Sequence, residues 1–358
     1  MNRYASRLFL AVRYVIGLFG LTLTRTSTEL TSFHIHSGHG RYDASRPLPA
    51  DLAAVLSDDN PDLVRLRARY GRTASPYRPG RFWRRSRRLR DLDLRYFRGD
   101  NAYVWQLRQL GDNARLKFFL LAQYVKALDS HKLLERTSED GAFGCWTFDF
   151  HGLPTASRDL LDSVNEIYFL DRHEDLLSRT GFTVVDIGAG YGRLAHRMAE
   201  CVPGLKRYLC VDAIAESTFL SEVYLRYRGV GDKATVLRLD EATDRLAAER
   251  PDLAVNIHSF SEMPIAAIDA WVGLLARIGV PTLLIVPNEG DRLLSLEDDV
   301  VRLDFAPVLR RHGYVLAVRE PTVSDPDVRE LAGVGDWFLL YRLAGGRPES
   351  EAPERPAP

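Results

Sequence analysis

Cysteine is scarce in this chain of 358 residues, and neither sign of charge dominates it. The three cysteines, Cys145, Cys201 and Cys210, are too few for a disulfide framework, and none lies at zinc-ligand spacing from another cysteine or a histidine. We therefore expect a reducing, cytoplasmic compartment. The 48 basic and 48 acidic side chains give a formal net charge of zero, which argues against a uniformly basic nucleic-acid binder.

Lysine is also rare, since only five of the 48 basic residues are lysines and the rest are arginines. The net charge hides a regional difference. Residues 1–160 hold 26 basic and 16 acidic side chains, whereas the remainder holds 22 and 32. This split predicts two regions with different surfaces.

The ends of the chain lack a clear membrane span. Residues 8–23 (LFLAVRYVIGLFGLTL) are apolar apart from Arg13, which is short of the ~20 apolar residues a span needs. Residues 1–28 are expected either to pack as a helix on the protein's own core or to lie as a basic helix at the inner membrane face. Residues 346–358 are rich in Pro and Glu and are expected to be a disordered tail.

Residues 29–164 are expected to form a mainly helical region. Apolar residues recur at three- and four-residue steps over 116–134, which is typical of one buried helical stripe. Seven arginines and no acid lie between Arg78 and Arg90, together with Phe82 and Trp83. An anionic partner or a solvated helix face would both explain this run.

From residue 183 onward, short β-branched runs alternate with helical stretches, which predicts a parallel sheet covered on both faces. The last two runs have no long helix between them and are expected to pair antiparallel. The fold class is therefore α/β, with a doubly wound, mostly parallel sheet of seven strands. The expected strands are 183–187, 207–212, 234–239, 253–258, 281–287, 314–320 and 336–343.

A glycine-rich loop, Gly188-Ala189-Gly190-Tyr191-Gly192, follows the first of these strands and precedes a helix. A dinucleotide site wants G-x-G-x-x-G, and this loop is one residue shorter. Asp186, two residues before the loop, would sit poorly beside a pyrophosphate but could favour the cationic S-adenosylmethionine (SAM). The loop therefore favours SAM.

Two acids follow the next strands. Asp212 ends the second strand, where its carboxylate could accept both ribose hydroxyls, and Asp240 ends the third, where it could receive the adenine amino group. Each could instead be a helix N-cap. We expect the cofactor-binding residues to be Asp186, Gly188, Ala189, Gly190, Tyr191, Gly192, Asp212, Ala213, Asp240 and Asn256.

These features resemble the class I SAM-dependent methyltransferases over about residues 165–343, from VVDIGAGYGRLA through LCVDA. More narrowly, NIHSFSEMP (256–264), SRDLLDSVNEIYFL (157–170) and YFRGDNAYVWQLRQ (96–109) are similar to a family of sugar O-methyltransferases. The resemblance implies a Rossmann-like methyltransferase fold over 165–345, with SAM as the cofactor.

Methyl transfer needs positioning and removal of the acceptor's proton. His258, just after the fourth strand, is the expected general base, and Glu262 is expected to orient it or to bind an acceptor hydroxyl. A bonded loop histidine and a helix-start acid are the structural alternatives. We expect no metal site, although Glu289 and Asp291 leave a magnesium requirement open.

The acceptor is expected to meet the helical N-terminal region, which would lie over the strand ends as a lid, through Tyr103, Trp105 and Gln106. The sequence thus predicts a SAM-dependent O-methyltransferase of glycan biosynthesis, acting on a sugar, sugar-nucleotide or glycan. The alternatives are a methyltransferase of a non-sugar metabolite and a non-catalytic module that binds glycan or membrane.

Overall fold

The computed structural model describes most of the chain. The N-terminal segment 1–28, apart from two isolated residues, and the tail 346–358 lie outside the described residues, and with them the expectations of membrane contact and of a disordered tail. Within the described part, no helix is long and apolar enough to cross a membrane. The described residues are Val12, Val15, 33–36, 40–73, 76–84, 89, 92–101, 103–104, 106, 114–137, 139–298 and 300–345.

A seven-stranded sheet in the order β5-β4-β3-β6-β7-β9-β8 forms the centre of the molecule. The first five strands in this order are parallel, and β9 runs antiparallel to both β7 and β8. The doubly wound, mostly parallel sheet expected from the sequence is therefore confirmed. The strands are β3 (Phe182–Ile187), β4 (Leu205–Val211), β5 (Ala234–Leu237), β6 (Leu253–Ile257), β7 (Thr282–Val286), β8 (Tyr314–Pro321) and β9 (Trp337–Leu343).

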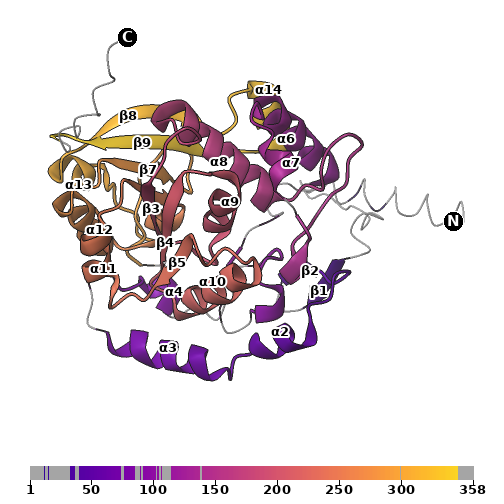
Figure 1. Cartoon of the computed structure of the whole chain (residues 1–358), viewed down its shortest axis with the longest axis horizontal. Coiled ribbons are helices and arrows are strands. Elements are labelled where there is room, and N and C mark those ends of the chain that lie inside the picture. The colour runs from indigo at the N-terminus through magenta and orange to yellow at the C-terminus, as the bar shows by residue number, and fades with distance from the viewer. Residues whose placement is uncertain are drawn as a thin grey trace, which may run out of the picture.

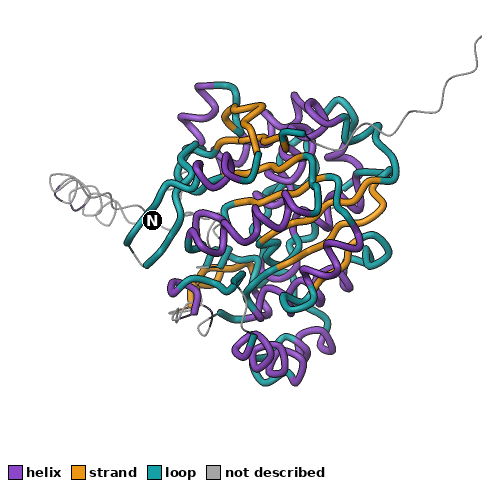
Figure 2. The backbone as a smooth tube through the Cα atoms, turned by 90° about the vertical axis from the view of Figure 1, so that its left-hand side faces the viewer, coloured by secondary structure: helices purple, strands orange, loops and turns teal. Residues whose placement is uncertain are grey.

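Helices cover both faces of this sheet (Figures 1 and 2). Every residue of β3 and β7 is buried, which explains why these strands are continuous hydrophobic runs without polar alternation. On one face lie α8 (Arg158–Glu174), α9 (Arg193–Cys201) and α10 (Ala215–Tyr227), and on the other α11 (Ala242–Glu249), α12 (Ile265–Arg277) and α13 (Ala306–Arg311).

The register of the central strands brings the candidate residues to one edge of the sheet. Asp186 pairs with Cys210 of β4 and with Val255 of β6. Because these strands are parallel, the loops after β3, β4 and β6 leave the sheet side by side, which is where α/β sheets bind ligands. The glycine loop, Asp212 and His258 all lie in these loops.

The N-terminal region is mainly helical, as expected, but it also holds an antiparallel hairpin of β1 (Phe33–His36) and β2 (Gly40–Asp43). The apolar stripe expected over 116–134 is divided between two helices, α6 (Ala114–Leu128) and α7 (Leu133–Arg136). In α6 every third or fourth residue is buried, and the helix packs against α8 and α14 (Pro326–Ala332). The described helices of the N-terminal region are α2 (Ala50–Val55), α3 (Pro61–Arg72), α4 (Arg81–Arg84), the 3-10 helices η2 (Leu94–Tyr96) and η4 (Ala142–Gly144), α6 (Ala114–Leu128) and α7 (Leu133–Arg136).

Helix α3 joins this region to the sheet. Asn60 caps α3 by accepting a hydrogen bond from the backbone of Asp62, and the helix packs on α10. The Tyr70 hydroxyl lies 2.9 Å from the Thr218 hydroxyl and accepts a hydrogen bond from the backbone N–H of Leu239. Residues more than a hundred positions apart thus share one core.

Several boundaries differ from the expected ones. The expected division between residues 164 and 165 falls inside α8, which belongs to both regions. Strand β5 ends at Leu237 rather than at residue 239. The sequence reading did not identify α11 or the seven-residue α14 (Pro326–Ala332).

Candidate functional site

A cavity of about 510 Å³ opens at the edge of the sheet where β3, β4 and β6 end. This volume is in the range of small-molecule sites. Its walls come from the glycine loop, from the loops after β4, β6 and β7, from the start of α8 and from the N-terminal region. The expected cofactor residues that line it are Asp186, Gly188, Ala189, Gly190, Tyr191, Asp212 and Ala213.

The glycine loop has a backbone that other residues rarely adopt. Gly188, Gly190 and Gly192 have φ angles of 78°, 58° and 86°. A Cβ on Gly188 would lie 2.1 Å from the Ser259 hydroxyl oxygen, and a Cβ on Gly190 would lie 3.5 Å from the Tyr103 hydroxyl. The loop therefore needs glycine for its turn and, at Gly188, for the close approach of the β6 loop.

Asn256 does not line the cavity and instead fixes these two loops to each other. Its side-chain amide donates to the carbonyl of Ile187 at 2.7 Å and to the Ser259 hydroxyl, and its carbonyl accepts from the backbone of Phe260. It is fully buried. The expectation that Asn256 contacts the cofactor is therefore corrected, because its polar atoms already serve the backbone around β3 and β6.

Asp212 ties the end of β4 to the glycine loop. One carboxylate oxygen accepts a hydrogen bond from the backbone N–H of Gly190 at 3.0 Å, and the other accepts from Ile214 at 2.8 Å. Burial raises the pKa of Asp212 to about 7. A carboxylate has about four lone-pair sites, so Asp212 can still accept hydroxyl groups from a ligand in the cavity.

Asp186 lies deeper in the same wall. Its carboxylate accepts a hydrogen bond from the Tyr208 hydroxyl at 2.9 Å, and burial raises its pKa to about 7. Two carboxyl groups with raised pKa values therefore line the cavity. A cationic ligand would favour their charged forms.

Two other expected cofactor residues lie away from the cavity lining. Asp240 follows β5 by three residues and forms an ion pair with Arg69 of α3 at 2.6 Å. This carboxylate holds the N-terminal region, and the expected contact with adenine stays a prediction. Gly192 is the N-cap of α9, and a Cβ there would lie 3.0 Å from the Ser221 hydroxyl oxygen, so the close packing of this turn requires glycine.

His258 lines the cavity directly after β6, at the position expected for a general base. Its φ of 66° is unusual for a residue with a side chain, and its backbone N–H donates to the carbonyl of Val286 at 2.7 Å. Burial lowers the pKa of His258, an effect that Asp336 partly opposes. The buried Nδ1 has no hydrogen-bond partner among the described residues. At neutral pH the ring is thus uncharged.

Glu262 also lines the cavity, one turn of 3-10 helix further along. One of its carboxylate oxygens accepts from the Trp83 indole N–H at 3.1 Å, and the other accepts from the side-chain amide of Asn288 at 3.3 Å. This carboxylate faces the cavity between the N-terminal region and the loop after β7. Its position suits contact with an acceptor hydroxyl, one of its two expected roles.

The three residues expected to bind the acceptor separate in space. Tyr103 lines the cavity, but its buried hydroxyl lies beside Gly190, at the expected cofactor end. Gln106 is fully buried and donates to the carboxylate of Asp159 at 2.7 Å, so it is corrected to a structural residue. Trp105 lies outside the described residues.

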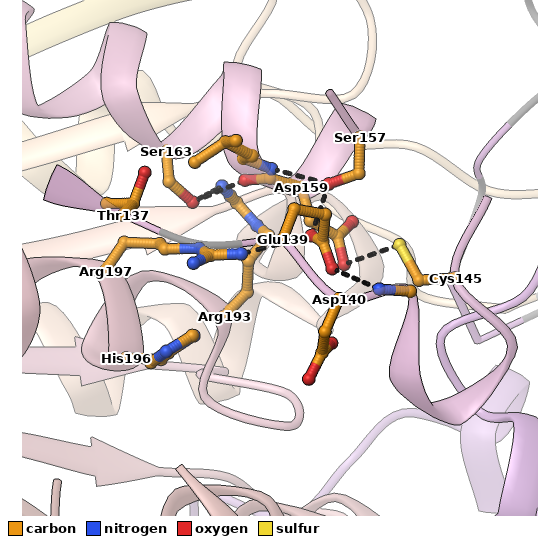
Figure 3. A network of polar contacts seen from close by, with 12 residues as sticks. Thr137, Glu139, Asp140, Cys145, Ser157, Asp159, Ser163, Arg193, His196 and Arg197 are labelled. Carbon is orange, nitrogen blue, oxygen red and sulfur yellow. Dashed lines mark hydrogen bonds and ion pairs between the residues drawn. The ribbon is translucent and has the colours of Figure 1, made fainter. Parts of the chain in front are cut away.

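A buried polar network joins residues 137–163 to α9, the helix that follows the glycine loop (Figure 3). Glu139 forms ion pairs with Arg98 at 2.8 Å and with Arg197 at 3.1 Å, and these arginines lower its pKa well below the usual value although burial raises it. Arg98 also pairs with Asp159, whose carboxylate accepts from the Tyr191 hydroxyl. Tyr191 of the glycine loop is thus fixed by residues from outside the sheet.

The carboxylates considered for magnesium are paired with arginines. Glu289 forms ion pairs with Arg292 at 2.7 Å and with Arg302 at 3.1 Å, and Asp291 pairs with Arg319. Among the described residues, no group of three or more potential ligands could hold a metal ion.

The sequence reading missed several residues of the cavity wall. Arg158 and Asp162 belong to the first turns of α8, Asp336 precedes β9, and Asn288 follows β7. Asn288 carried a usable signal, since it comes two residues after a central parallel strand. For the others, only the tertiary packing of α8 and of the N-terminal region reveals their place.

The strand order, with an antiparallel strand inserted at one side of five parallel strands, gives a Rossmann-like methyltransferase fold. No protein-family model and no curated protein matches the sequence.

Among solved structures, the chain is similar to the magnesium protoporphyrin IX methyltransferase of Synechocystis PCC 6803 with bound SAM, with 14% identity, 64% of this chain and 97% of that chain covered, and a TM-score of 0.37. It is also similar to the mitomycin 7-O-methyltransferase MmcR, with 18% identity, 51% and 52% covered, and a TM-score of 0.38. A third is the cyclase SpnF, with 15% identity, 56% and 86% covered, and a TM-score of 0.40.

Proposed function

We propose that this protein is a SAM-dependent methyltransferase that methylates a hydroxyl group of a sugar or glycan intermediate. The observation that carries the proposal is the single cavity wall that joins the positive-φ glycines, Asp212 and His258 at the ends of β3, β4 and β6. The glycine-loop backbone, a carboxylate that can accept hydrogen bonds from ribose hydroxyls, and a neutral imidazole ring thus line the same cavity.

The residues present fit SAM. Gly188 and Gly190 present bare backbone to the cavity, and Asp212 can accept ribose hydroxyls beside them. The buried Tyr103 ring lies next to this loop and lines the cavity. Among the described residues that line the cavity, seven carry carboxyl groups and three carry guanidinium groups, which favours a ligand with net positive charge.

His258 would remove the proton from the acceptor hydroxyl. When bound, SAM supplies a methyl group on a positively charged sulfur, which is transferred in line to an oxygen nucleophile. A neutral imidazole can accept the hydroxyl proton during this transfer, and the lowered pKa of His258 keeps the ring neutral at pH 7. The backbone hydrogen bond to Val286 fixes the backbone of His258 beside β7.

Calorimetry with SAM tests the cofactor assignment. We expect binding that weakens in Asp212→Ala, because the substitution removes the carboxylate next to Gly190. Asp232→Ala is the control, since this exposed acid lies away from the cavity. Absence of SAM binding would reject the proposal and would leave a non-catalytic module as the better reading.

A panel with labelled methyl donor tests the acceptor. Glycosides, glycans, sugar nucleotides and small phenols are incubated with the protein, and labelled products are identified. Methylated glycosides are the expected products. Labelling of phenols alone would favour the alternative of a non-sugar metabolite.

A further inference from the structure

We infer that the acceptor is an uncharged, hydroxyl-rich ring that packs on Trp83 and donates a hydrogen bond to Glu262, and that phosphorylated sugars are poor acceptors. The inference rests on the proposed function, because the acceptor must share the cavity with SAM. Of the acceptors expected from the sequence, it keeps sugars and glycans and excludes sugar-nucleotides.

Residues 76–84 of the N-terminal region are firmly placed at the cavity. The Tyr77 ring packs on the buried Trp271 ring of α12, with centroids 4.1 Å apart. A Cβ on Gly80 would lie 3.2 Å from the Pro264 side chain, so this segment runs close against the loop after β6. Trp83 follows three residues later and is therefore held at the cavity wall.

Trp83 and Glu262 together offer what a sugar ring needs. The indole N–H is bound to Glu262, which fixes the ring's orientation. A flat aromatic surface binds the apolar C–H face of a sugar, whereas carboxylate and amide groups bind its hydroxyls. Asn288 supplies the amide on the other side of Glu262. One aromatic ring and two polar groups from three different segments thus meet at one place.

The guanidinium groups at the cavity already have carboxylate partners. Arg158 pairs with Asp162 at 3.1 Å, and Arg302 pairs with Glu289 at 3.1 Å. Arg193 likewise forms a 2.7 Å pair with a buried glutamate of α8. A phosphate group would compete with these carboxylates for the guanidinium groups and would lie in a lining whose seven carboxyl groups outnumber its three guanidinium groups. Repulsion between like charges makes this unfavourable.

The described arginines of the run from Arg78 to Arg90 do not change the charge of the cavity lining. Arg78 donates to the backbone carbonyl of Gly71, and Arg81 lies 3.8 Å from Asp298. Neither these two nor Arg84 is among the cavity-lining residues. Of the run's described residues, Pro79 and Trp83 line the cavity, and neither carries a charge.

The test compares matched acceptors with the full-length protein, after calorimetry has established SAM binding. Methyl glycosides of common hexoses are compared with the corresponding hexose phosphates and nucleotide sugars. We expect kcat/KM to be at least about tenfold higher for the uncharged member of each pair. Higher values for the phosphorylated members, or no methylation of any uncharged member, would overturn the inference. Absence of SAM binding would instead overturn the proposed function.

Variants of Trp83 test the site itself. Trp83→Ala should raise KM for the glycoside by about tenfold or more, and Trp83→Phe by less, because phenylalanine keeps an aromatic face. Phe82→Ala is the matched control, since Phe82 is the neighbouring aromatic residue and does not line the cavity. Unchanged SAM affinity shows that each variant is folded. Equal KM values for all three variants and the wild type would refute the placement of the acceptor.

Glu262→Gln tests the exclusion of phosphate. It removes one negative charge from the cavity, so the preference for uncharged over phosphorylated acceptors should shrink by about fivefold. The ratio of the two kcat/KM values measures this change independently of any general loss of activity. An unchanged ratio would show that Glu262 has no part in the discrimination.

Discussion

Replacing Gly188 by alanine tests how the glycine loop and the β6 loop form one site. Gly188 has a φ of 78°, and the added Cβ would lie 2.1 Å from the Oγ and 2.3 Å from the Cβ of Ser259. Gly181, at the other end of β3, offers a matched control. Its φ is 72°, but no atom lies within 4 Å of the position that a Cβ would take. The two substitutions therefore share the backbone strain and differ in crowding.

The expected magnitudes follow from these two terms. A positive φ costs a residue with a side chain about 1–2 kcal/mol, and overpacking a filled site costs a further 1–3 kcal/mol or so. Gly181→Ala should therefore lower the free energy of unfolding by about 1–2 kcal/mol, and Gly188→Ala by about 2–5 kcal/mol. The difference between the variants reports the close contact with Ser259.

Urea denaturation of both variants and of Ser259→Gly measures these values, with the double variant Gly188→Ala/Ser259→Gly closing the cycle. In the Gly188→Ala background, removing the Ser259 side chain should restore most of the unfolding free energy lost to crowding and none of that lost to the positive φ. Equal costs for the two alanine substitutions would refute the reasoning. So would a double variant whose cost is the sum of its single variants.

Three further predictions follow from the site and the buried network. His258→Gln should lower kcat by about 10²–10⁴-fold with SAM affinity nearly unchanged. The wild-type rate should fall only below pH 6.5, because burial lowers the pKa of His258. Stopped-time assays across pH measure both effects. Asp186 has a folded pKa of about 7 against 3.8, so its contribution to stability is full below pH 3.8 and is lost as pH rises through 7. Asp186→Asn should therefore be more stable than the SAM-free wild type, and this difference in unfolding free energy should grow between pH 5 and pH 8 to about 4 kcal/mol. Urea denaturation of both proteins at the two pH values measures the difference. A difference that does not change with pH would contradict the prediction. Glu139→Gln should cost about 3–5 kcal/mol of unfolding free energy, because it leaves two buried arginines without their shared carboxylate, whereas Glu135→Gln at an exposed pair should cost less than about 1 kcal/mol by thermal or urea denaturation.

The sheet could be predicted because its signal is local. Each central strand is a short apolar run buried on both faces, and each run is separated from the next by a helical pattern. The glycine loop could be found for the same reason, since its spacing lies within five residues. Asp212 and His258 followed, because the ends of parallel strands meet at one edge.

The remaining cavity wall depends on contacts between distant segments. Asp240 follows a strand as Asp212 does, yet Arg69 of α3 binds its carboxylate away from the cavity. Trp83 was part of an arginine-rich run, and nothing local shows that it reaches Glu262, 179 residues later. Gln106 was chosen for its amide, which a buried carboxylate occupies. Residue type alone does not separate these outcomes.

The buried network has a consequence for how the chain folds during its synthesis. Arg98 leaves the ribosome well before its partners Glu139 and Asp159, and Arg197 is made last. At about 5–20 residues per second, the interval between the two arginines is about 5–20 s. A buried guanidinium without its carboxylate is strongly unfavourable, so the complete network can form only after helix α9 has been made. The segment around Arg98 therefore completes its buried contacts only after strand β3 and helix α9 have been made.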